Sequence, residues 1–447
     1  GRVMIDISPE LLTVLMLGGV LLGVMTGFPL ALMIGGVGLI VGYLAFGPTV
    51  LDILYHRVFG NVTNYTLLAV PLFIFMGIML ERSGVAEKLY EALYVWLGGL
   101  RGGLAVATIL IGTIMAACVG IIGASVTMLA IVALPAMVKR GYDRGLAAGS
   151  VCAGGTLGIL IPPSIMLVVY GPMALISVGK LFMAAFIPGL ILSALYCTYV
   201  LVRCLIQPRI APTVPLEERQ IPLWTKTKRL IISLAPPALL IISVLGVIFL
   251  GIAPPTEAAA VGALMATILT AVYGRFSFKV LTETAHDTLK LASAVLLIAA
   301  ASFAFTGVFL NAGGGTVVKE FILATPGGRW GAFAVIMFVC FILGMFIDWM
   351  GIIFIIVPIV TPVAPELGFE PLWFAMMIIV NLQMSFMTPP FAYAIFFTRA
   401  AAPPELNVTT SDVIRGVIPF VLLILVGLAL CVAFPELILW LPSKMIA

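Results

Sequence analysis

Long apolar runs constrain this chain more than any other feature of its sequence. Examples are residues 11–25, 30–46, 181–202 and 413–434, and their lengths approach or match the roughly 17 to 25 residues that cross about 30 Å of hydrocarbon as a helix. Hydrophobic residues make up 62% of the 447 residues and charged residues only 9%, whereas soluble domains carry about 25% charge. We therefore expect an all-α membrane protein that spans the bilayer about ten times.

The composition also excludes several classes of function. The chain holds no G-x-x-x-x-G-K-[ST] string, so we expect an ion gradient and not ATP to supply the energy. No cluster of His, Cys or acidic residues converges within the apolar runs, which argues against an enzyme or a bound cofactor. Most Lys and Arg residues lie between the runs, and this placement gives no support to nucleic-acid binding.

Several motifs recur at equivalent places in the two halves of the chain, which indicates an internal repeat. Gly141-Tyr142-Asp143 precedes Pro162-Pro163 by the same interval at which Gly368-Phe369-Glu370 precedes Pro389-Pro390. Gly77 likewise corresponds to Gly307, within a string of matching residues. We expect two repeats, residues 1–202 and 230–447, joined by a cytoplasmic linker at 203–229.

Two apolar stretches differ from the other runs because each breaks at a Gly-rich centre. They are residues 104–138 and 330–360, and their arms are too short to span the bilayer comfortably. We interpret both as re-entrant helical hairpins, which are tolerated where the bend is buried in protein or faces a water-filled cavity. Each repeat then has five spans and one hairpin, and an odd number of spans makes the second repeat inverted relative to the first.

The distribution of positive charge predicts a periplasmic N-terminus. With that orientation only six of the 23 Lys and Arg residues lie outside, as the positive-inside rule requires. The loop 139–144 is then cytoplasmic and the loop 364–370 periplasmic. Segments 49–60 and 275–290 have mixed polarity, which suits helices along the membrane surface or ordinary connecting loops. The six outer residues are Arg2, Arg57, Lys180, Lys319, Arg329 and Lys444.

Each proline pair breaks a helix inside the membrane, in segments 146–170 and 372–397. Proline donates no backbone hydrogen bond, so carbonyl groups about one turn earlier are freed. Ser164 and Thr388 add hydroxyl groups beside the breaks. Carbonyl and hydroxyl oxygens suit Na⁺, and the N-termini of half-helices suit an anion. The alternative is a kink that serves helix packing alone.

Asp348 is the most conspicuous acidic residue within an apolar stretch. It could cap the second arm of its hairpin, bind a cation at the tip, or couple transport to a proton. Ser125 lies ten residues before Pro135, as Asp348 lies ten before Pro358. We therefore expect Ser125 and Asp348 to occupy matching positions and to share a capping role.

Taken in their order along the chain, four sequence strings resemble those of the large membrane subunit of tripartite ATP-independent periplasmic (TRAP) transporters. The resemblance covers essentially the whole chain. The resemblance implies a bacterial inner-membrane protein that works by an elevator motion, with Na⁺ as coupling ion. It also implies three partners besides lipid: a periplasmic substrate-binding protein, a membrane subunit of about four helices, and a small organic anion. The strings are Ile161-Pro162-Pro163-Ser164, Pro255-Thr256-Glu257-Ala258-Ala259-Ala260-Val261-Gly262, Thr388-Pro389-Pro390, and Ser177-Val178-Gly179-Lys180-Leu181-Phe182 with Pro188-Gly189.

The resemblance also assigns the candidate site residues and the substrate class. The expected substrate is a small carboxylate, such as a 2-oxo acid, or a small sulfonate. A stand-alone sodium–carboxylate symporter of a related hairpin-containing fold is the alternative. The first sodium site is expected at Gly120, Ser125, Gly158, Ile161 and Pro162; the second at Gly344, Asp348, Met387, Thr388 and Pro389; and the substrate site at Ser125, Ser164, Asp348 and Thr388.

Overall fold

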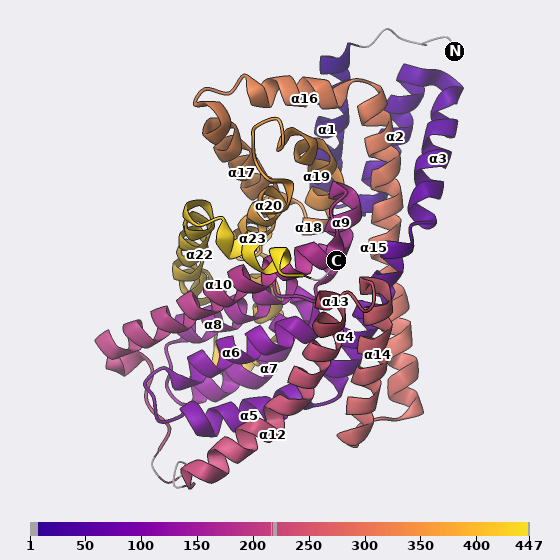
Figure 1. The fold of residues 1–447 in the computed structure, drawn as a ribbon. Coiled ribbons are helices and arrows are strands. Elements are labelled where there is room, and N and C mark those ends of the chain that lie inside the picture. Colours follow the sequence, from indigo (N-terminus) through magenta and orange to yellow (C-terminus); the bar gives the residue numbers. More distant parts are fainter. Residues whose placement is uncertain (1–7, 216, 218–220, 446–447) are drawn as a thin grey trace.

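The computed structural model describes residues 8–215, 217 and 221–445, and these residues form an all-helical protein (Figure 1). Nine of their helices are long and apolar enough to cross a membrane, and α1 (Pro9–Met25) is an apolar helix of 17 residues. The expected class, an all-α protein with many membrane spans, is thereby confirmed. Arg2, which entered the charge count, lies outside the described residues.

The order of elements in the first part of the chain recurs in the second. In both parts, spans are followed by a hairpin, a broken helix and a further long helix. The first part holds α1, α2 (Leu30–Phe46), α3 (Val50–Val62), α4 (Ala69–Arg82), α5 (Val85–Leu97), α6 (Gly103–Val119), α7 (Ile122–Lys139), α8 (Arg144–Thr156), α9 (Ile165–Ala174) and α10 (Val178–Ile206). The second holds α12 (Leu223–Ile241), α13 (Val247–Phe249), α14 (Pro255–Val272), α15 (Phe278–Asn311), α16 (Gly314–Leu323), α17 (Gly328–Phe346), α18 (Trp349–Gly351), α19 (Val357–Val360), α20 (Pro371–Ser385), α21 (Tyr393–Ala401), α22 (Thr410–Ala433) and α23 (Glu436–Ser443).

The repeated Gly-x-acid turn has the same local function at both places. Gly141 and Gly368 have positive φ angles of 82° and 75°, which glycine adopts without a steric penalty. Two residues later the acid caps the broken helix: Asp143 Oδ1 accepts from the Leu146 N–H at 2.8 Å, and Glu370 Oε2 accepts from the Trp373 N–H at 2.6 Å. Each turn therefore ends one hairpin and starts the helix that carries the proline pair.

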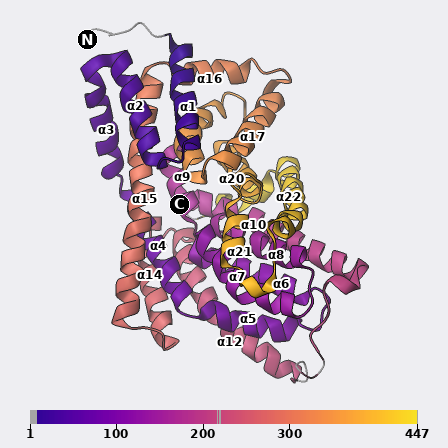
Figure 2. The same ribbon diagram turned by 180° about the vertical axis from the view of Figure 1, so that it is seen from behind.

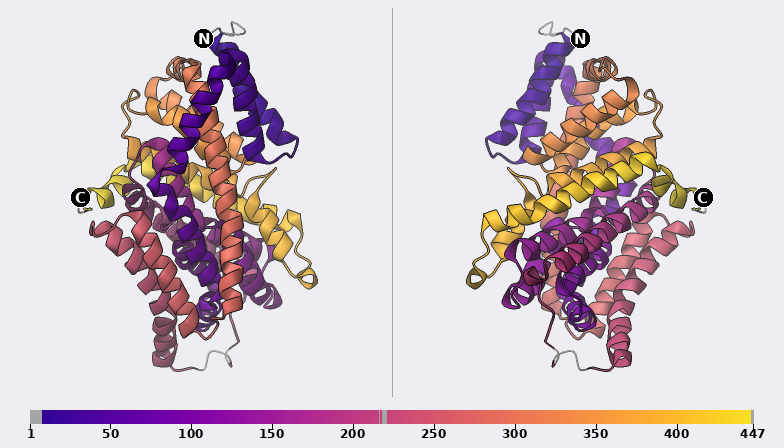
Figure 3. Two further views of the ribbon diagram at one scale, coloured as in Figure 1. Left: turned by 90° about the vertical axis from the view of Figure 1, so that its right-hand side faces the viewer. Right: turned by 90° about the vertical axis from the view of Figure 1, so that its left-hand side faces the viewer.

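Segment 275–290 does not form a separate helix, whereas segment 49–60 does. Residues from Phe278 onward belong to α15, a straight helix of 34 residues and about 50 Å (Figure 3). No Gly or Pro interrupts it before Gly307, so nothing in the sequence breaks the helix where its polarity changes. The other segment forms α3, which packs along α15.

Two groups of helices pack against each other through α4. The long-helix group consists of α2, α3, α4, α14 and α15, in which α15 contacts α2, α3 and α4, and α4 contacts α14. The hairpin group consists of α6–α9 and α17–α21, and α8 and α20 pack against α22. Figure 2 shows the long-helix group on one side of the molecule and the hairpin group beside it.

Candidate transport site

The first broken helix is interrupted between α8 and α9 by Pro162 and Pro163. Because neither proline has an N–H, the carbonyls of Gly158 and Ile159 lose their usual helical donors. The Ser164 hydroxyl replaces one of them, since it donates to the Ile159 carbonyl at 2.5 Å. The break thus presents backbone oxygen atoms and one hydroxyl within a fully buried segment.

The tip of the first hairpin lies against this break. Gly120 ends α6 with a φ of 66°, and a Cβ at this position would lie 3.2 Å from the Pro163 carbonyl oxygen. The Ser125 hydroxyl is 3.0 Å from the place a Cβ would take on Gly158. Ser125 is 1% exposed and its Oγ has no hydrogen-bond partner. The structure therefore brings Gly120, Ser125 and Gly158 together beside the loop that contains Ile161 and Pro162.

The second broken helix is interrupted between α20 and α21 and is held to its own hairpin tip. The Phe391 N–H donates to the Met345 carbonyl at 3.1 Å. A Cβ on Gly344 would lie only 2.2 Å from the Ser385 Oγ. Gly344 therefore directly contacts the end of α20. Its neighbour Met345 accepts the hydrogen bond that joins the hairpin tip to the break.

The second break leaves fewer free carbonyls than the prolines alone predict. The Phe386 carbonyl accepts from the Ala394 N–H at 3.0 Å, and the Ser385 carbonyl accepts from the Thr388 N–H at 3.4 Å. The Thr388 hydroxyl donates to the Met384 carbonyl at 2.7 Å. Its oxygen keeps lone pairs that can still bind a cation, beside Met387 and Pro389.

Asp348 caps the second arm of its hairpin, as one of the three interpretations predicted. Its Oδ1 accepts from the Trp349 N–H at 2.8 Å. The predicted match with Ser125 is wrong, because the corresponding arm begins after Ile121 and Ser125 lies one turn inside α7. Counted from these N-caps, Pro135 corresponds to Pro362 and not to Pro358.

A cavity of about 540 Å³, here called the inner cavity, lies between the two groups of helices. Both hairpin tips reach it, and the start of α21 completes that wall. Asp348 lines the cavity, whereas Ser125 and Ser164 are fully buried away from it and Thr388 is not among its lining residues. The lining residues are Ile78, Glu81, Arg82, Ile121, Ile122, Gly123, Ala124, Asp287, Lys290, Leu291, Asp348, Trp349, Tyr393 and Phe397.

Two cations of the long-helix group line the inner cavity and differ in their partners. Arg82 at the end of α4 binds Glu283 at 2.7 Å and Asp287 at 2.5 Å, both on α15. Lys290 is exposed and forms no ion pair with any residue that the structure describes. Lys290 is thus the cation available to an anion, and our sequence analysis missed it because it belongs to a segment that we had assigned to the membrane surface.

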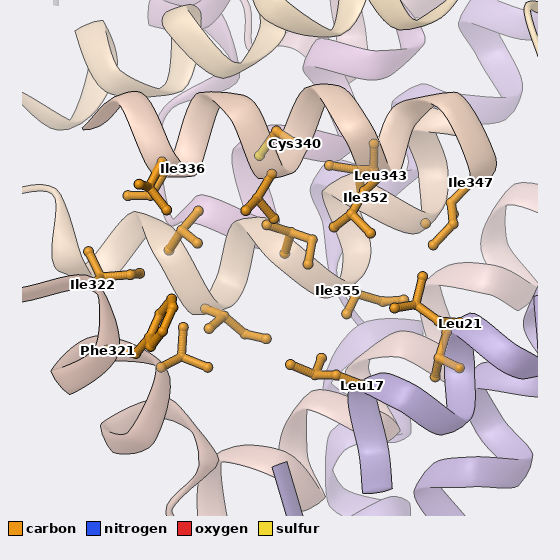
Figure 4. Close-up of a pocket in the computed structure, with 18 residues that line it drawn as sticks. Leu17, Leu21, Phe321, Ile322, Ile336, Cys340, Leu343, Ile347, Ile352 and Ile355 are labelled. Carbon is orange, nitrogen blue, oxygen red and sulfur yellow. The ribbon is translucent and has the colours of Figure 1, made fainter. Parts of the chain in front are cut away.

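A second cavity, of about 300 Å³, has no charged or hydroxyl-bearing lining residue (Figure 4). It lies between α1, α16 and the second hairpin, with Leu17, Ile336 and Ile355 among its walls. An apolar cavity of this kind offers no group that could recognise an anion. This apolar cavity is therefore not a candidate site for an ionic substrate.

Bilayer-length helices around two hairpins whose tips meet at one polar cavity define a multi-pass membrane transport protein, not an enzyme. Residues 13–437 match the family described as "Tripartite ATP-independent periplasmic transporter, DctM component", and the chain belongs to this family. Membership implies a substrate-binding protein and a small membrane subunit as partners.

Similar proteins include three large permease proteins of TRAP transporters. The chain is 33% identical to the C4-dicarboxylate protein DctM of Pseudomonas aeruginosa, with 90% of this chain and 91% of that one covered. It is 29% identical to the sialic acid protein SiaM of Vibrio cholerae (91% and 94% covered) and to the ectoine/5-hydroxyectoine protein UehC of Ruegeria pomeroyi (93% and 95%). The crystal structure of the Alcanivorax borkumensis YdaH transporter superposes with a TM-score of 0.62 at 17% identity, covering 86% and 88% of the two chains, and so shares the fold.

Proposed function

We propose that this protein imports a small organic anion across the bacterial inner membrane in symport with Na⁺. A periplasmic binding protein delivers the anion, and a small four-helix membrane subunit completes the transporter. The observation that carries the proposal is the inner cavity, where both hairpin tips, one broken helix and an unpaired Lys290 meet.

The inner cavity has positive charge from two helix N-termini and Lys290, and its other charged lining residues are Glu81, Asp348 and the Arg82–Asp287 ion pair. The N-terminal residues of α7 and α21 line it, and helix N-termini carry a partial positive charge. Lys290 adds a full positive charge on the opposite wall. Asp348 is the counterpart on the hairpin side, and its carboxylate favours a nearby Na⁺ over a second anion. The three groups together suit a carboxylate or sulfonate that enters with Na⁺.

The size of the cavity and the named relatives support a small organic acid. A volume of about 540 Å³ accommodates a 2-oxo acid, a C4-dicarboxylate or a small sulfonate with water molecules beside it. Relatives carry the names C4-dicarboxylate and sialic acid transporter proteins. We propose that the hairpin group carries the substrate past the long-helix group in an elevator motion, since the cavity lies at the border between the two groups.

Uptake into proteoliposomes tests the proposal. The complete transporter is reconstituted and offered labelled pyruvate, succinate and taurine, with and without an inward Na⁺ gradient and the cognate binding protein. We expect uptake of one of the three probes, and only when the Na⁺ gradient and the binding protein are both present. Uptake that needs Na⁺ but no binding protein would favour the stand-alone symporter. Uptake that needs the binding protein but is indifferent to Na⁺ would refute sodium coupling.

Thr388 tests the second sodium site. Replacing it with Ala removes the hydroxyl oxygen beside the break, so the Na⁺ concentration for half-maximal uptake should rise several-fold. Thr388→Ser keeps the oxygen and should stay close to the parent protein. If both variants keep the parent's Na⁺ dependence, Thr388 serves only to cap the Met384 carbonyl.

A further inference from the structure

A third cavity, here called the outer cavity, lies apart from the candidate transport site. It measures about 460 Å³ and shares no lining residue with the inner cavity. Its walls come from α3, α9, α15, the end of the second hairpin and the start of α20. With the predicted orientation of the chain, these segments lie in the periplasmic half. The outer cavity therefore lies on the side from which an imported substrate arrives.

Among the residues that the structure describes, Arg57 on α3 is the single charged one that lines the outer cavity. It is exposed, and it forms no ion pair among the described residues. Its side chain lies across Gly307 of α15, where a Cβ would be only 2.6 Å from Arg57 Cγ. Because Gly307 has no side chain, the alkyl part of the Arg57 side chain can pack against α15. No acidic residue opposes this charge in the lining.

Thr306, the neighbour of Gly307, supplies an unused hydroxyl in the same wall. It is 7% exposed, and its Oγ1 has no hydrogen-bond partner in the described part of the chain. Helical threonines can donate to the carbonyl four residues earlier; within α15 Thr288 does so at 2.7 Å, whereas Thr284 and Ser302, like Thr306, do not. A buried hydroxyl without a partner costs free energy. A ligand in the outer cavity would remove this cost.

A free guanidinium and an unpaired hydroxyl in one wall are suited to a carboxylate. Arginine presents N–H groups that match the two oxygens of a planar anion, and hydrogen bonds to charged groups are stronger than those between neutral groups. We infer that the outer cavity is a second anion site, in which Arg57 and Thr306 hold a small carboxylate. The inference goes beyond the proposed function and rests on it only for the direction of transport. A carboxylate released by a binding protein would occupy this site before it reaches the hairpin tips.

A cysteine reporter tests the site without requiring transport or Na⁺. Leu310 lines the outer cavity and is 40% exposed, so Leu310→Cys can be labelled in the purified protein. Reaction rates are measured with an anionic sulfonatoethyl and a cationic trimethylammonioethyl methanethiosulfonate reagent. We expect Arg57→Gln to lower the ratio of anionic to cationic rates on the order of tenfold, and Arg57→Lys to preserve it. Pyruvate, at constant ionic strength, should slow labelling of the reporter in the parent but not with Arg57→Gln.

Two controls define the result that would overturn the inference. Phe434 is 59% exposed and does not line the outer cavity, so the ratio at Phe434→Cys should not respond to Arg57→Gln. The parent chain without a reporter gives the background from its six native cysteines, five of them buried. A ratio at Leu310→Cys that is indifferent to Arg57 would refute the site. If Arg57→Gln lowers this ratio but pyruvate does not slow labelling in the parent, Arg57 creates a positive potential in the cavity and the carboxylate site is refuted. Neither outcome depends on uptake, so the proposed function stands or falls separately.

Discussion

Gly344 and Ser385 show how single residues hold the second hairpin to its broken helix. The Ser385 hydroxyl donates to the Phe341 carbonyl at 3.4 Å, and one turn earlier Asn381 Nδ2 donates to the Met337 carbonyl at 2.9 Å. These contacts require α17 and α20 to approach closely. Gly344 permits the approach because a Cβ there would lie 2.2 Å from Ser385 Oγ and 2.5 Å from Ser385 Cβ.

Gly344→Ala should therefore destabilise the protein. Overpacking of a tight contact costs about 1–3 kcal/mol, and the gain in helix propensity from Gly to Ala returns at most about 1 kcal/mol. We expect a lower midpoint of thermal unfolding in detergent, and partial recovery when Ser385→Gly is added. Gly18→Ala is the matched control, since no atom lies within 4 Å of its added Cβ. Equal midpoints for Gly344→Ala and Gly18→Ala would show that the contact between Gly344 and Ser385 can relax without loss of stability.

Residues that are chemical exceptions in an apolar segment were predictable from the sequence. Asp348 and the two proline pairs stand out because acids and helix breaks are costly in a membrane, and the structure places all of them at hairpin tips or helix breaks. Arg82 and Lys290 were not predictable as cavity residues. Their roles depend on which partners the fold brings near them, and the partners of Arg82, Glu283 and Asp287, are about 200 positions away in the sequence.

At the scale of elements, α4 connects the long-helix group to the first hairpin. Gly77 of α4 meets the last residue of α6, since a Cβ on Gly77 would lie 2.3 Å from the Val119 carbonyl oxygen. Its counterpart in the predicted repeat, Gly307 of α15, has the Arg57 side chain in that place. The two corresponding glycines thus contact different groups in this conformation, one a hairpin tip and the other a side chain.

Gly77→Ala should push the first tip away from α4. A Cβ cannot remain 2.3 Å from a backbone oxygen, so this conformation should lose population by roughly fivefold or more if the clash costs at least about 1 kcal/mol. Cysteines at Ile78 and Ile121, which both line the inner cavity, report on the contact through a short bifunctional thiol reagent. We expect slower cross-linking with Gly77→Ala and no change with Gly36→Ala, whose added Cβ has open space. An unchanged rate with Gly77→Ala would mean that the tip does not depend on this contact.

The sequence was a good guide to element types and a weaker guide to their continuity. The Gly-rich centres marked where α6 and α17 end, because positive φ or extended backbone is needed there. The polar start of α15 suggested a separate surface helix, but polarity alone does not end a helix that lacks Gly and Pro. The ion pairs of Arg82 on α4 with Glu283 and Asp287 hold the polar start of α15 against the rest of the fold.

At the scale of the whole molecule, the predicted inverted repeat places the bases of the two hairpins on opposite sides of the membrane. The base of the first hairpin carries Lys139, the last residue of α7, and Arg140, whereas the loop after α19 carries no Lys or Arg. Single cysteines at Lys139 and Glu366 should therefore react from opposite sides with an impermeant thiol reagent in cells and in inverted vesicles. Reaction of both cysteines from the same side would end the inverted-repeat interpretation.

Transport should carry net positive charge inward. The two breaks, each with its own hairpin tip, suggest one Na⁺ at each, so a monovalent anion would enter with a net charge of +1 or more per cycle. Each net charge gains about 2.3 kcal/mol per 100 mV of membrane potential. A potassium diffusion potential, negative inside, should therefore accelerate uptake of a monoanion into proteoliposomes at a fixed Na⁺ gradient. A dianion that enters with two Na⁺ should be indifferent to the potential, which makes succinate the internal control for pyruvate.

If uptake of a proven monoanion does not respond to the membrane potential, one of the two cation sites is empty or structural. The site at Met387–Pro389 would then be the one to retain, because the Thr388 hydroxyl lies directly beside the break.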